Sequence, residues 1–314
     1  MNQAPIAYIV FNRPRQTART FATLRAQRPA ELFIIADGPR RGHPTDAERC
    51  AEARAIVEQV DWPCAIHRNY SEINLGCKKR VSSGLDWVFG QVERAIVLED
   101  DCLPHADFFT FCSTLLEHYA DDQRVWVITG ANFQNGQRRG DRAYYFSQYN
   151  HVWGWATWRR AWRHYSGDLP FWPEWKNSAR WRENFRDPRQ CSYWSAIFDR
   201  VYADEIDTWD YPWTASVWYH GGLTATPNVN LVTNIGIGPD ATHTCAAEER
   251  EGIPVSSLGA LTHPTRVKQD RRADQYVFEH TFGGGRPDGS RRVLGLLRGL
   301  VGKAYRIIRH RLIS

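Results

Sequence analysis

A short apolar run that ends in three consecutive acids constrains this chain more than any other feature. Ala95 to Leu98 are apolar and are followed directly by Glu99, Asp100 and Asp101. An apolar run of this length predicts a buried strand. Side chains just beyond the carboxyl end of such a strand lie where open α/β sheets bind their ligands. The alternative is a solvated acidic turn at the end of a strand.

The three acids predict a site for a hard divalent cation, Mn²⁺ or Mg²⁺. Adjacent carboxylates repel one another unless a cation neutralises them, and oxygen ligands favour hard ions. We expect the acids to lie together at a cavity. We also expect Asp101 to be free of an internal ion pair, because an internal cation would take the place of the metal.

The first hundred residues alternate the signals of strands and helices. Apolar runs predict strands over 6–11, 32–36, 64–67 and 95–98, and the segments between them predict helices over 15–28, 45–60 and 77–92. This alternation is typical of βαβ units, whose right-handed crossovers bring the ends of parallel strands to one edge. Asn12, Asp37 and the three acids should therefore meet there. An apolar helical face from Phe108 to Tyr119 predicts a core helix.

The second half of the chain is rich in tryptophan, with eleven of the fourteen between Trp153 and Trp218. Aromatic rings can stack on the apolar faces of sugars, but packing in a core is their commoner use, and we expect it for most of these. In the segment 151–158, Gly154 lies between two tryptophans and would let the backbone approach a ligand. Residues 208–236 predict extended segments and turns.

Composition and charge exclude several classes of protein. The chain has 314 residues, of which 42% are apolar and 24% charged, as in soluble globular proteins. Its seven cysteines have no CxxC spacing, which argues against a disulfide framework or a zinc cluster and for a reducing compartment. Residues 290–314 contain six Arg, one Lys and no acid; without these seven, 33 basic residues face 35 acidic ones. We therefore expect no nucleic-acid groove. No signal peptide or membrane-spanning segment is visible, so we expect a cytoplasmic location.

Five segments, in the same order along the chain, carry a resemblance to a known family. They are LGCKKRVSSGLDWVF (75–89), RAIVLEDDCLPHADFF (94–109), HVWGWATWRRAW (151–162), TWDYPW (208–213) and NIGIGPDATHT (234–244). They resemble the GT-A glycosyltransferases, most closely N-acetylglucosaminyltransferase I and bacterial enzymes grouped with family 2. The resemblance implies an α/β, Rossmann-like nucleotide-sugar-binding fold with a mixed central sheet.

The resemblance also implies an activity and the residues that perform it. The activity is inverting, metal-dependent transfer of a hexosyl or N-acetylhexosaminyl group from a nucleoside-diphosphate sugar, UDP favoured, to a glycan or lipid-linked acceptor, as in surface polysaccharide assembly. Asp101 would be the metal ligand and Asp210 the catalytic base. The implied donor-binding residues are Asn12, Arg13, Asp37, Arg80, Glu99, Asp100 and His243, and the implied acceptor-side residues are Gly154 and Trp155. The segment 236–244 would close over the donor. The chain departs from the family at Tyr211, where a second Asp is usual, and at Arg80, where a His is usual.

We expect one GT-A domain over residues 1–281, with a nucleotide-binding half (1–125) and an acceptor-side half (126–281). A linker rich in Gly and Pro follows over 282–289, and a basic tail over 290–314. The tail has an apolar helical face and predicts an amphipathic helix that binds an anionic membrane surface, so that the enzyme is peripheral at the inner face of the membrane. A helix docked on its own domain and a solvated tail are the alternatives.

Two other functions stay open. A sugar nucleotidyltransferase would normally carry a Gly-rich, basic loop after the first strand, where this chain has FNRPRQT (11–17) without glycine. A non-catalytic carbohydrate-binding or membrane-associated protein could use the tryptophans and the basic tail, but it has no need for three acids at a strand end. Structural roles are also open at single residues. Asp210 could cap a turn or pair with an Arg, Arg80 could be solvated, and His243 could lie on the surface.

Overall fold

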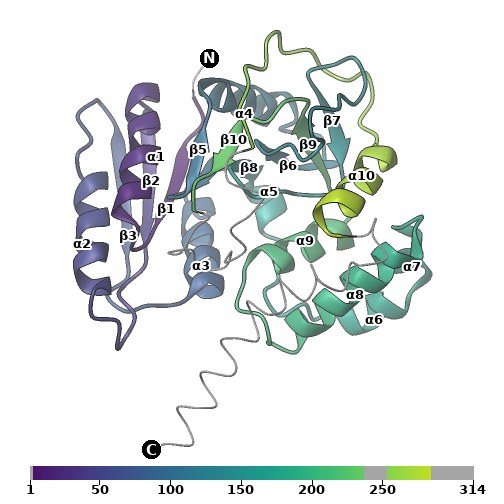
Figure 1. Cartoon of the computed structure of the whole chain (residues 1–314), viewed down its shortest axis with the longest axis horizontal. Coiled ribbons are helices and arrows are strands. Elements are labelled where there is room, and N and C mark those ends of the chain that lie inside the picture. Colours follow the sequence, from purple (N-terminus) through teal and green to yellow (C-terminus); the bar gives the residue numbers. More distant parts are fainter. Residues whose placement is uncertain (1–2, 237–252, 284–314) are drawn as a thin grey trace, which may run out of the picture.

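An eight-stranded mixed sheet with helices on both faces forms the centre of the molecule (Figure 1). This computed structural model describes residues 3–236 and 253–283. The elements in chain order are β1 (Ile6–Val10), α1 (Pro14–Gln27), β2 (Glu31–Ala36), α2 (Asp46–Val57), β3 (Ala65–Tyr70), α3 (Cys77–Phe89), β4 (Arg94–Glu99), β5 (Cys102–Pro104), α4 (Ala106–His118), β6 (Val125–Thr129), β7 (Tyr144–Ser147), β8 (Trp155–Trp158), α5 (Arg159–Trp162), α6 (Trp172–Asn177), α7 (Ala179–Glu183), α8 (Pro188–Tyr202), α9 (Asp210–Tyr219), β9 (Leu223–Pro227), β10 (Val232–Asn234) and α10 (Arg271–Thr281).

The order of the strands creates a switch point between β1 and β4. The sheet runs β3-β2-β1-β4-β8-β6-β9-β7, and its first four strands are parallel. β8 then runs antiparallel to β4 and to β6, so the sheet is mixed. The predicted α/β class with a mixed sheet is confirmed. β2 and β4 flank β1 on opposite sides, and the crossover helices α1 and α3 lie on opposite faces of the sheet, so a crevice opens at the carboxyl ends of β1 and β4.

Alternate residues of the central strands supply two separate cores. Ile6 and Tyr8 of β1 contribute to one core, and Ala7 and Ile9 contribute to the other. Helices α1, α2 and α4 cover the first core, while α3 and α5 to α9 cover the second. The strands are therefore apolar on both faces, as expected of a sheet covered by helices on both sides.

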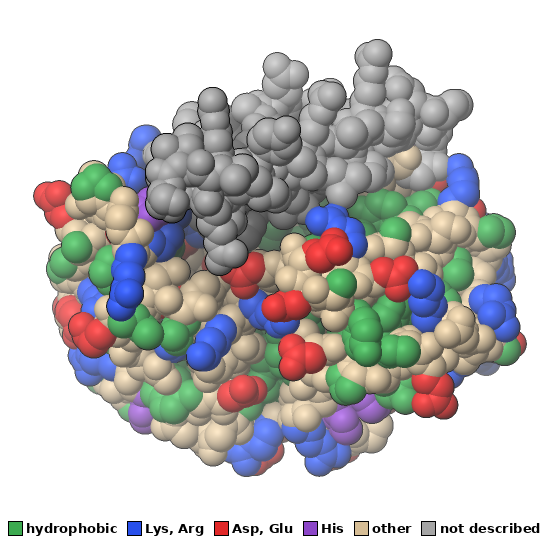
Figure 2. Space-filling model, turned by 90° about the horizontal axis from the view of Figure 1, so that it is seen from below, with side chains coloured by type: hydrophobic (Ala, Val, Ile, Leu, Met, Phe, Trp, Pro, Cys, Tyr) green, Lys and Arg blue, Asp and Glu red, His purple; other side chains and the backbone are tan. Residues whose placement is uncertain are grey.

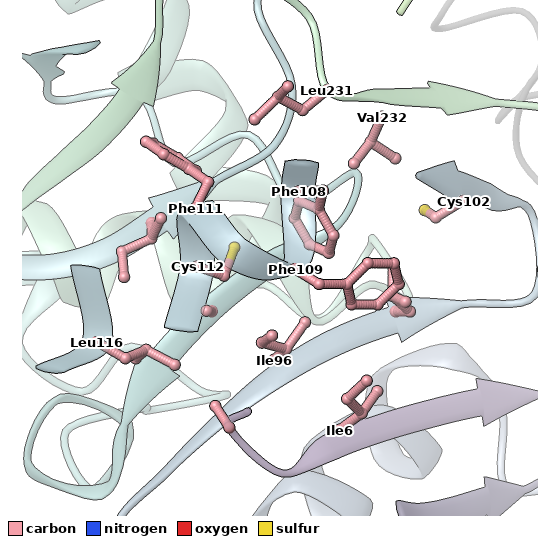
Figure 3. Close-up of a cluster of buried hydrophobic side chains, with 14 of the residues drawn as sticks. Ile6, Ile96, Cys102, Phe108, Phe109, Phe111, Cys112, Leu116, Leu231 and Val232 are labelled. Carbon is pink, nitrogen blue, oxygen red and sulfur yellow. The ribbon is translucent and has the colours of Figure 1, made fainter. Parts of the chain in front are cut away.

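The predicted helix over 108–119 is confirmed as α4 and belongs to the first core. Figure 3 shows Phe108, Phe109 and Cys112 lying among Ile6, Ile96 and other apolar side chains. These α4 residues are at most 1% exposed. Their packing fixes the position of β4, and with it the position of the acids that follow.

The tryptophans of the second half are mainly core residues. Ten of the eleven between Trp153 and Trp218 are buried, so the preference for packing over sugar stacking is confirmed for them. Trp155 stacks on Trp209 with ring centroids 5.5 Å apart. Trp153 is the remaining one of the eleven, and it is only half-buried.

The prediction of extended chain over 208–236 is wrong at its beginning, where α9 forms. Residues Pro212 to Trp218 of this helix are all buried. A helix that is buried on every side has no amphipathic pattern, and Trp, Tyr, Thr and Val are also common in strands. The sequence therefore resembled a strand. The later part of the segment is extended, as β9 and β10.

Parts of several predictions lie outside the described residues. These parts are residues 284–289 of the linker, the tail over 290–314, and residues 237–244 of the closing segment with His243. Among the helices that the structure describes, none combines the length and the hydropathy needed to cross a membrane.

Candidate functional site

A cavity of about 220 Å³ lies at the switch point between β1 and β4. Ile9 of β1 is paired with Glu99 of β4, so the segments that follow the two strands emerge side by side. We call this the acidic cavity. It is lined by Ile9, Val10, Phe11, Arg13, Asp37, Arg40, Asn74, Gly76, Cys77, Arg80, Val81, Glu99, Asp100, Asp101, Asp207, Asn234 and Gly236. The three acids therefore meet at one cavity, as predicted.

Arg13 supplies a positive charge to these acids from within the chain. Its guanidinium lies 2.5 Å from Oδ1 of Asp100 and 2.8 Å from Oδ2 of Asp101. The expectation that Asp101 is free of an internal ion pair is therefore wrong. Burial lowers the pKa of Arg13, but Asp100 and Asp101 outweigh this and raise the pKa above its ordinary value. The arginine stays charged, and it neutralises part of the repulsion for which we had invoked a metal.

Glu99 and Asp100 hold their protons more tightly than ordinary carboxyl groups do. Burial, followed by the charges of Asp101, Asp100 and Asp210, raises the pKa of Glu99 to about 8 against the opposing effect of Arg13. Burial also raises the pKa of Asp100 to about 6, although Arg13 lowers it. The cluster consequently carries less than three full negative charges near neutral pH.

Both carboxylate oxygens of Asp101 have a partner within the chain. Its Oδ2 accepts from Arg13, and its Oδ1 lies 3.6 Å from the thiol of Cys102. Among the described residues, no three His, Cys, Asp or Glu side chains gather to hold a metal. A divalent ion here would take most of its ligands from a diphosphate and water, which is how Mg²⁺ is commonly held beside nucleotides. Arg13 would have to release Oδ2 of Asp101.

Asp37 and Arg80 lie on the opposite wall of the acidic cavity. Asp37 accepts hydrogen bonds from the backbone N–H groups of Gly38 and Leu75 and from Nδ2 of Asn74. Burial raises its pKa despite these bonds. Arg80 is 5% exposed and donates to Oδ1 of Asn69 at 2.9 Å, so it is not a solvated helix residue.

Asn12 does not line the cavity, although sequence reasoning placed it with the donor. It is buried and donates to Oδ1 of Asp46 at 2.8 Å, and Asp46 also accepts from Arg40. Asn12 therefore supports the wall through Asp46. Arg40 lies in the connection after β2 and Asp46 in the first turn of α2, and the sequence reasoning assigned no site residue to either segment.

Gly236 is the first residue of the segment 236–244 that the resemblance places over the donor, and Asp207 is a cavity residue that the sequence did not identify. A Cβ on Gly236 would lie 2.3 Å from Oδ2 of Asp101 and 2.8 Å from Nη1 of Arg13. Only glycine fits at this distance, so the segment after β10 packs directly on the ion pair. Asp207 accepts from the backbone N–H of Lys78 at the start of α3. The sequence feature that could have identified Asp207 is its position directly before the segment TWDYPW (208–213).

Asp210 lies in a second cavity, of about 230 Å³, which we call the aromatic cavity. It is lined by Phe133, Tyr149, Asn150, His151, Val152, Trp153, Tyr193, Trp194, Asp210, Tyr211, Thr214, Thr281 and Phe282. Asp210 occupies the first turn of α9, and its Oδ1 accepts from the Thr208 hydroxyl and the Tyr211 N–H. No described residue bonds to Oδ2, and no described Arg pairs with this carboxylate.

Asp210 also lies within electrostatic reach of the acidic cavity. Its charge contributes to raising the pKa of Glu99 and of Cys77, both of which line that cavity, although burial is the larger cause for each. The Asp210 carboxylate thus lines the aromatic cavity, and its charge acts on two residues of the acidic cavity.

Gly154 and Trp155 lie in the core rather than along either cavity. Gly154 has a φ of +63°, and a Cβ there would lie 2.7 Å from Val232. Trp155 is fully buried against Trp209. Both help to place the neighbouring Trp153, which does line the aromatic cavity. Sequence reasoning identified the right segment but named its inward-facing residues.

The surface outside the cavities carries charges of both signs. Figure 2 shows one face of the molecule, on which acidic and basic side chains are intermixed with hydrophobic ones. No broad area of one sign is visible on the described part of this face.

Comparisons with known proteins assign no family to the chain. No protein-family model and no curated protein matches it. Among solved structures, a mannosyltransferase from Pyrobaculum calidifontis in complex with GDP-Man and Mn²⁺ is 14% identical, with 50% of this chain and 45% of that chain covered and a TM-score of 0.32. An inositol-1-phosphate CTP transferase from T. maritima is 9% identical, with 77% and 92% covered and a TM-score of 0.37. A 4-diphosphocytidyl-2C-methyl-D-erythritol synthase from Anaerococcus prevotii is 10% identical, with 71% and 88% covered and a TM-score of 0.34. Because these scores are far below 0.5, we rest neither the fold nor the function on them, and the resemblance to GT-A enzymes stays a prediction.

Proposed function

We propose that this protein is an inverting glycosyltransferase that moves a sugar from a nucleoside-diphosphate sugar to a glycan or lipid-linked acceptor. One observation supports this most strongly. Asp210 lines the cavity with aromatic walls, its charge acts on Glu99 in the cavity with charged walls, and one of its oxygens has no partner among the described residues. A charged donor and a sugar acceptor need these two environments, with a base between them.

The acidic cavity is suited to a nucleotide sugar. The Arg13 guanidinium can exchange a carboxylate for a phosphate, because both accept its fork of N–H groups. Asp37, which the turn 74–76 orients, and the buried Arg80 offer an acceptor and a donor to a base or ribose. A divalent ion at Asp101 would stabilise the negative charge on the departing diphosphate.

Asp210 is suited to remove a proton from the acceptor. Thr208 and Tyr211 hold its Oδ1, which fixes the direction of Oδ2. As the acceptor oxygen attacks the anomeric carbon from the side opposite the diphosphate, Oδ2 takes its proton, and the configuration inverts. Burial raises the pKa of Tyr211, so this neighbour stays a neutral phenol.

The location and the acceptor are supported by the sequence alone. The tail over 290–314 would hold the enzyme peripherally at the cytoplasmic face of an anionic membrane. A surface polysaccharide assembled at that membrane would then be the acceptor. UDP is the nucleotide we favour, and the resemblance to GT-A enzymes is the sole support for that preference.

A panel of nucleotide sugars tests the proposal. The full-length protein is incubated with each UDP-, GDP-, CDP- and dTDP-sugar in Mn²⁺, Mg²⁺ or excess chelator, and release of nucleoside diphosphate is measured. We expect release with at least one donor and its loss in chelator. Release that persists in chelator would remove the metal from the mechanism.

A second assay distinguishes the proposed glycosyltransferase from a sugar nucleotidyltransferase. A nucleotidyltransferase would instead form pyrophosphate from a nucleoside triphosphate and a sugar 1-phosphate. The connection from β1 to α1 consists of Phe11, Asn12 and Arg13, without a glycine-rich phosphate loop. We therefore expect no pyrophosphate. Pyrophosphate formation without any transfer from nucleotide sugars would overturn the proposed function.

A further inference from the structure

Asn150 is a buried amide that has no partner on either of its polar atoms. It is 5% exposed, and neither Oδ1 nor Nδ2 has a hydrogen bond to any described residue. Another buried amide nearby in sequence behaves in the ordinary way. Asn132 donates to the Pro227 carbonyl at 2.6 Å and accepts from the Gln134 N–H at 2.8 Å. Because buried polar groups are almost always paired, Asn150 requires an explanation, and it lines the aromatic cavity.

Half-buried rings form the walls around this amide. Phe133 and Trp153 contact each other with ring centroids 5.1 Å apart. Tyr193 and Phe282, which also line the cavity, contact each other with ring centroids 5.9 Å apart. The core tryptophans are fully covered by protein, whereas these rings keep exposed surface inside a cavity. Pyranose rings have apolar faces and a polar rim, so aromatic walls with one amide that both donates and accepts match them.

The charge of the cavity selects among sugars. Asp210 is the one carboxylate, and no Lys or Arg occurs, among the described residues that line it. His151 is neutral, because burial lowers its pKa to about 3. A uronate or a phosphate in this cavity would face Asp210 without a compensating cation. A neutral sugar would meet no such repulsion.

We propose that the aromatic cavity binds the accepting sugar as a neutral pyranoside and that Asn150 hydrogen-bonds its hydroxyl groups. This inference rests on the proposed function, because it identifies the cavity as the acceptor side of the enzyme. Asn150 is then a specificity-determining residue, and its missing partners are the hydroxyl groups of the acceptor.

Binding of simple glycosides tests this inference directly. Methyl glycosides of glucose, galactose, mannose and N-acetylglucosamine are compared with methyl glucuronide and methyl galacturonide by saturation-transfer NMR on the full chain. We expect at least one neutral glycoside to bind through its apolar face and the uronides to bind at least ten-fold more weakly. Uronides that bind as well as the neutral sugars would overturn the assignment.

Variants connect the binding to Asn150. Asn150→Asp keeps the shape but places a second carboxylate beside Asp210, and we expect glycoside affinity to fall at least ten-fold. Asn177→Asp, at an exposed position of α6, is the matched control and should bind as wild type does. If Asn150→Asp does not fold, Phe133→Leu removes one wall and should weaken the same glycoside. Unchanged affinity in a folded variant at either position contradicts the inference.

Nucleotide-dependent assays separate this inference from the function on which it rests. Donor-dependent release of nucleoside diphosphate that persists while neutral glycosides fail to bind would refute the acceptor assignment alone. Glycoside binding that depends on Asn150, with no reaction of any nucleotide sugar, would refute the transferase and leave a carbohydrate-binding site.

Discussion

The two cavities differ in how their polar groups are satisfied. In the acidic cavity, the charged groups are paired within the chain: Arg13 pairs with Asp100 and Asp101, and Asp37 accepts three hydrogen bonds, while only Nε of Arg13 and Nε of Arg80 lack a hydrogen bond among the buried guanidinium nitrogens of its described residues. In the aromatic cavity, Asn150 lacks a partner among the described residues, and Asp210 has one unbonded oxygen. A charged ligand of the acidic cavity must therefore replace an existing partner of Arg13. A neutral ligand of the aromatic cavity instead provides the hydrogen bonds that Asn150 lacks. The contrast indicates which half of a transfer reaction each cavity serves.

The largest effect should come from Asp210, because it lines the aromatic cavity and its charge acts on Glu99 in the acidic cavity. Asp210→Asn removes the proton acceptor but keeps the shape. We expect transfer to slow by about 10²–10⁴-fold, with affinity for the nucleoside diphosphate unchanged by calorimetry. Asp141→Asn, at an exposed ion pair with Arg142, serves as the control. A variant at Asp210 that loses nucleotide binding as well would show that the residue belongs to the acidic cavity alone.

Arg13 should matter for stability as well as for binding. Arg13→Gln leaves the buried carboxylate of Asp100 without its cation, and breaking a buried pair in this way costs about 3–5 kcal/mol. The free energy of unfolding in urea measures it. Arg25→Gln breaks an ion pair with Asp61 in which both side chains are exposed, and should cost less than about 1 kcal/mol. Equal losses in the two variants would mean that the acids do not depend on Arg13.

Gly236 tests whether the segment after β10 must pack on the ion pair. Gly236→Ala places a Cβ 2.3 Å from Asp101 and should cost roughly 1–3 kcal/mol of overpacking. We expect about ten-fold weaker binding of nucleoside diphosphate. Gly167→Ala meets its nearest neighbour, Lys78, at 3.5 Å and is the matched control. Identical affinities in the two variants would place this segment outside the donor site.

Asp46 should give a smaller, pH-dependent effect. Its hydrogen bond from Arg40 lowers its pKa from 3.8 to about 2, although burial opposes the shift. A lowered pKa stabilises the fold above pH 3.8, and this stabilisation is lost as the pH falls toward 2. Allowing for the part-exposed Arg40, we expect Asp46→Asn to lose about 1–2 kcal/mol at pH 7. In urea unfolding the difference from wild type should shrink below pH 4, and a difference that grows there would contradict this assignment.

The parallel half of the fold could be predicted because its signals are local. The apolar runs that became β1, β2 and β4 each lie within a few consecutive residues, and the helices α1 and α3 have an apolar face. The convergence of Asp37 with the acids followed from the handedness of the crossovers. The helix α9 was missed because it is buried on all sides and has no polar face to set a period.

The aromatic cavity could not be predicted because it is assembled from distant segments. Phe133, Trp153, Tyr211 and Phe282 come together only in the folded chain. Within the sequence, Trp153 is indistinguishable from the neighbouring Trp155. Trp155 begins β8 and is buried, whereas Trp153 precedes the strand, on the other side of Gly154 with its φ of +63°. The pair between Arg13 and Asp101 joins residues 88 positions apart and depends on the direction of one side chain.

The relation between the two cavities is tested most directly by a crystal structure of the protein with a nucleoside diphosphate and a bound neutral glycoside. The account predicts the diphosphate beside Arg13 and Asp101, and a glycoside hydroxyl within hydrogen-bonding distance of Oδ2 of Asp210. A glycoside bound elsewhere, or a nucleotide outside the acidic cavity, would contradict it.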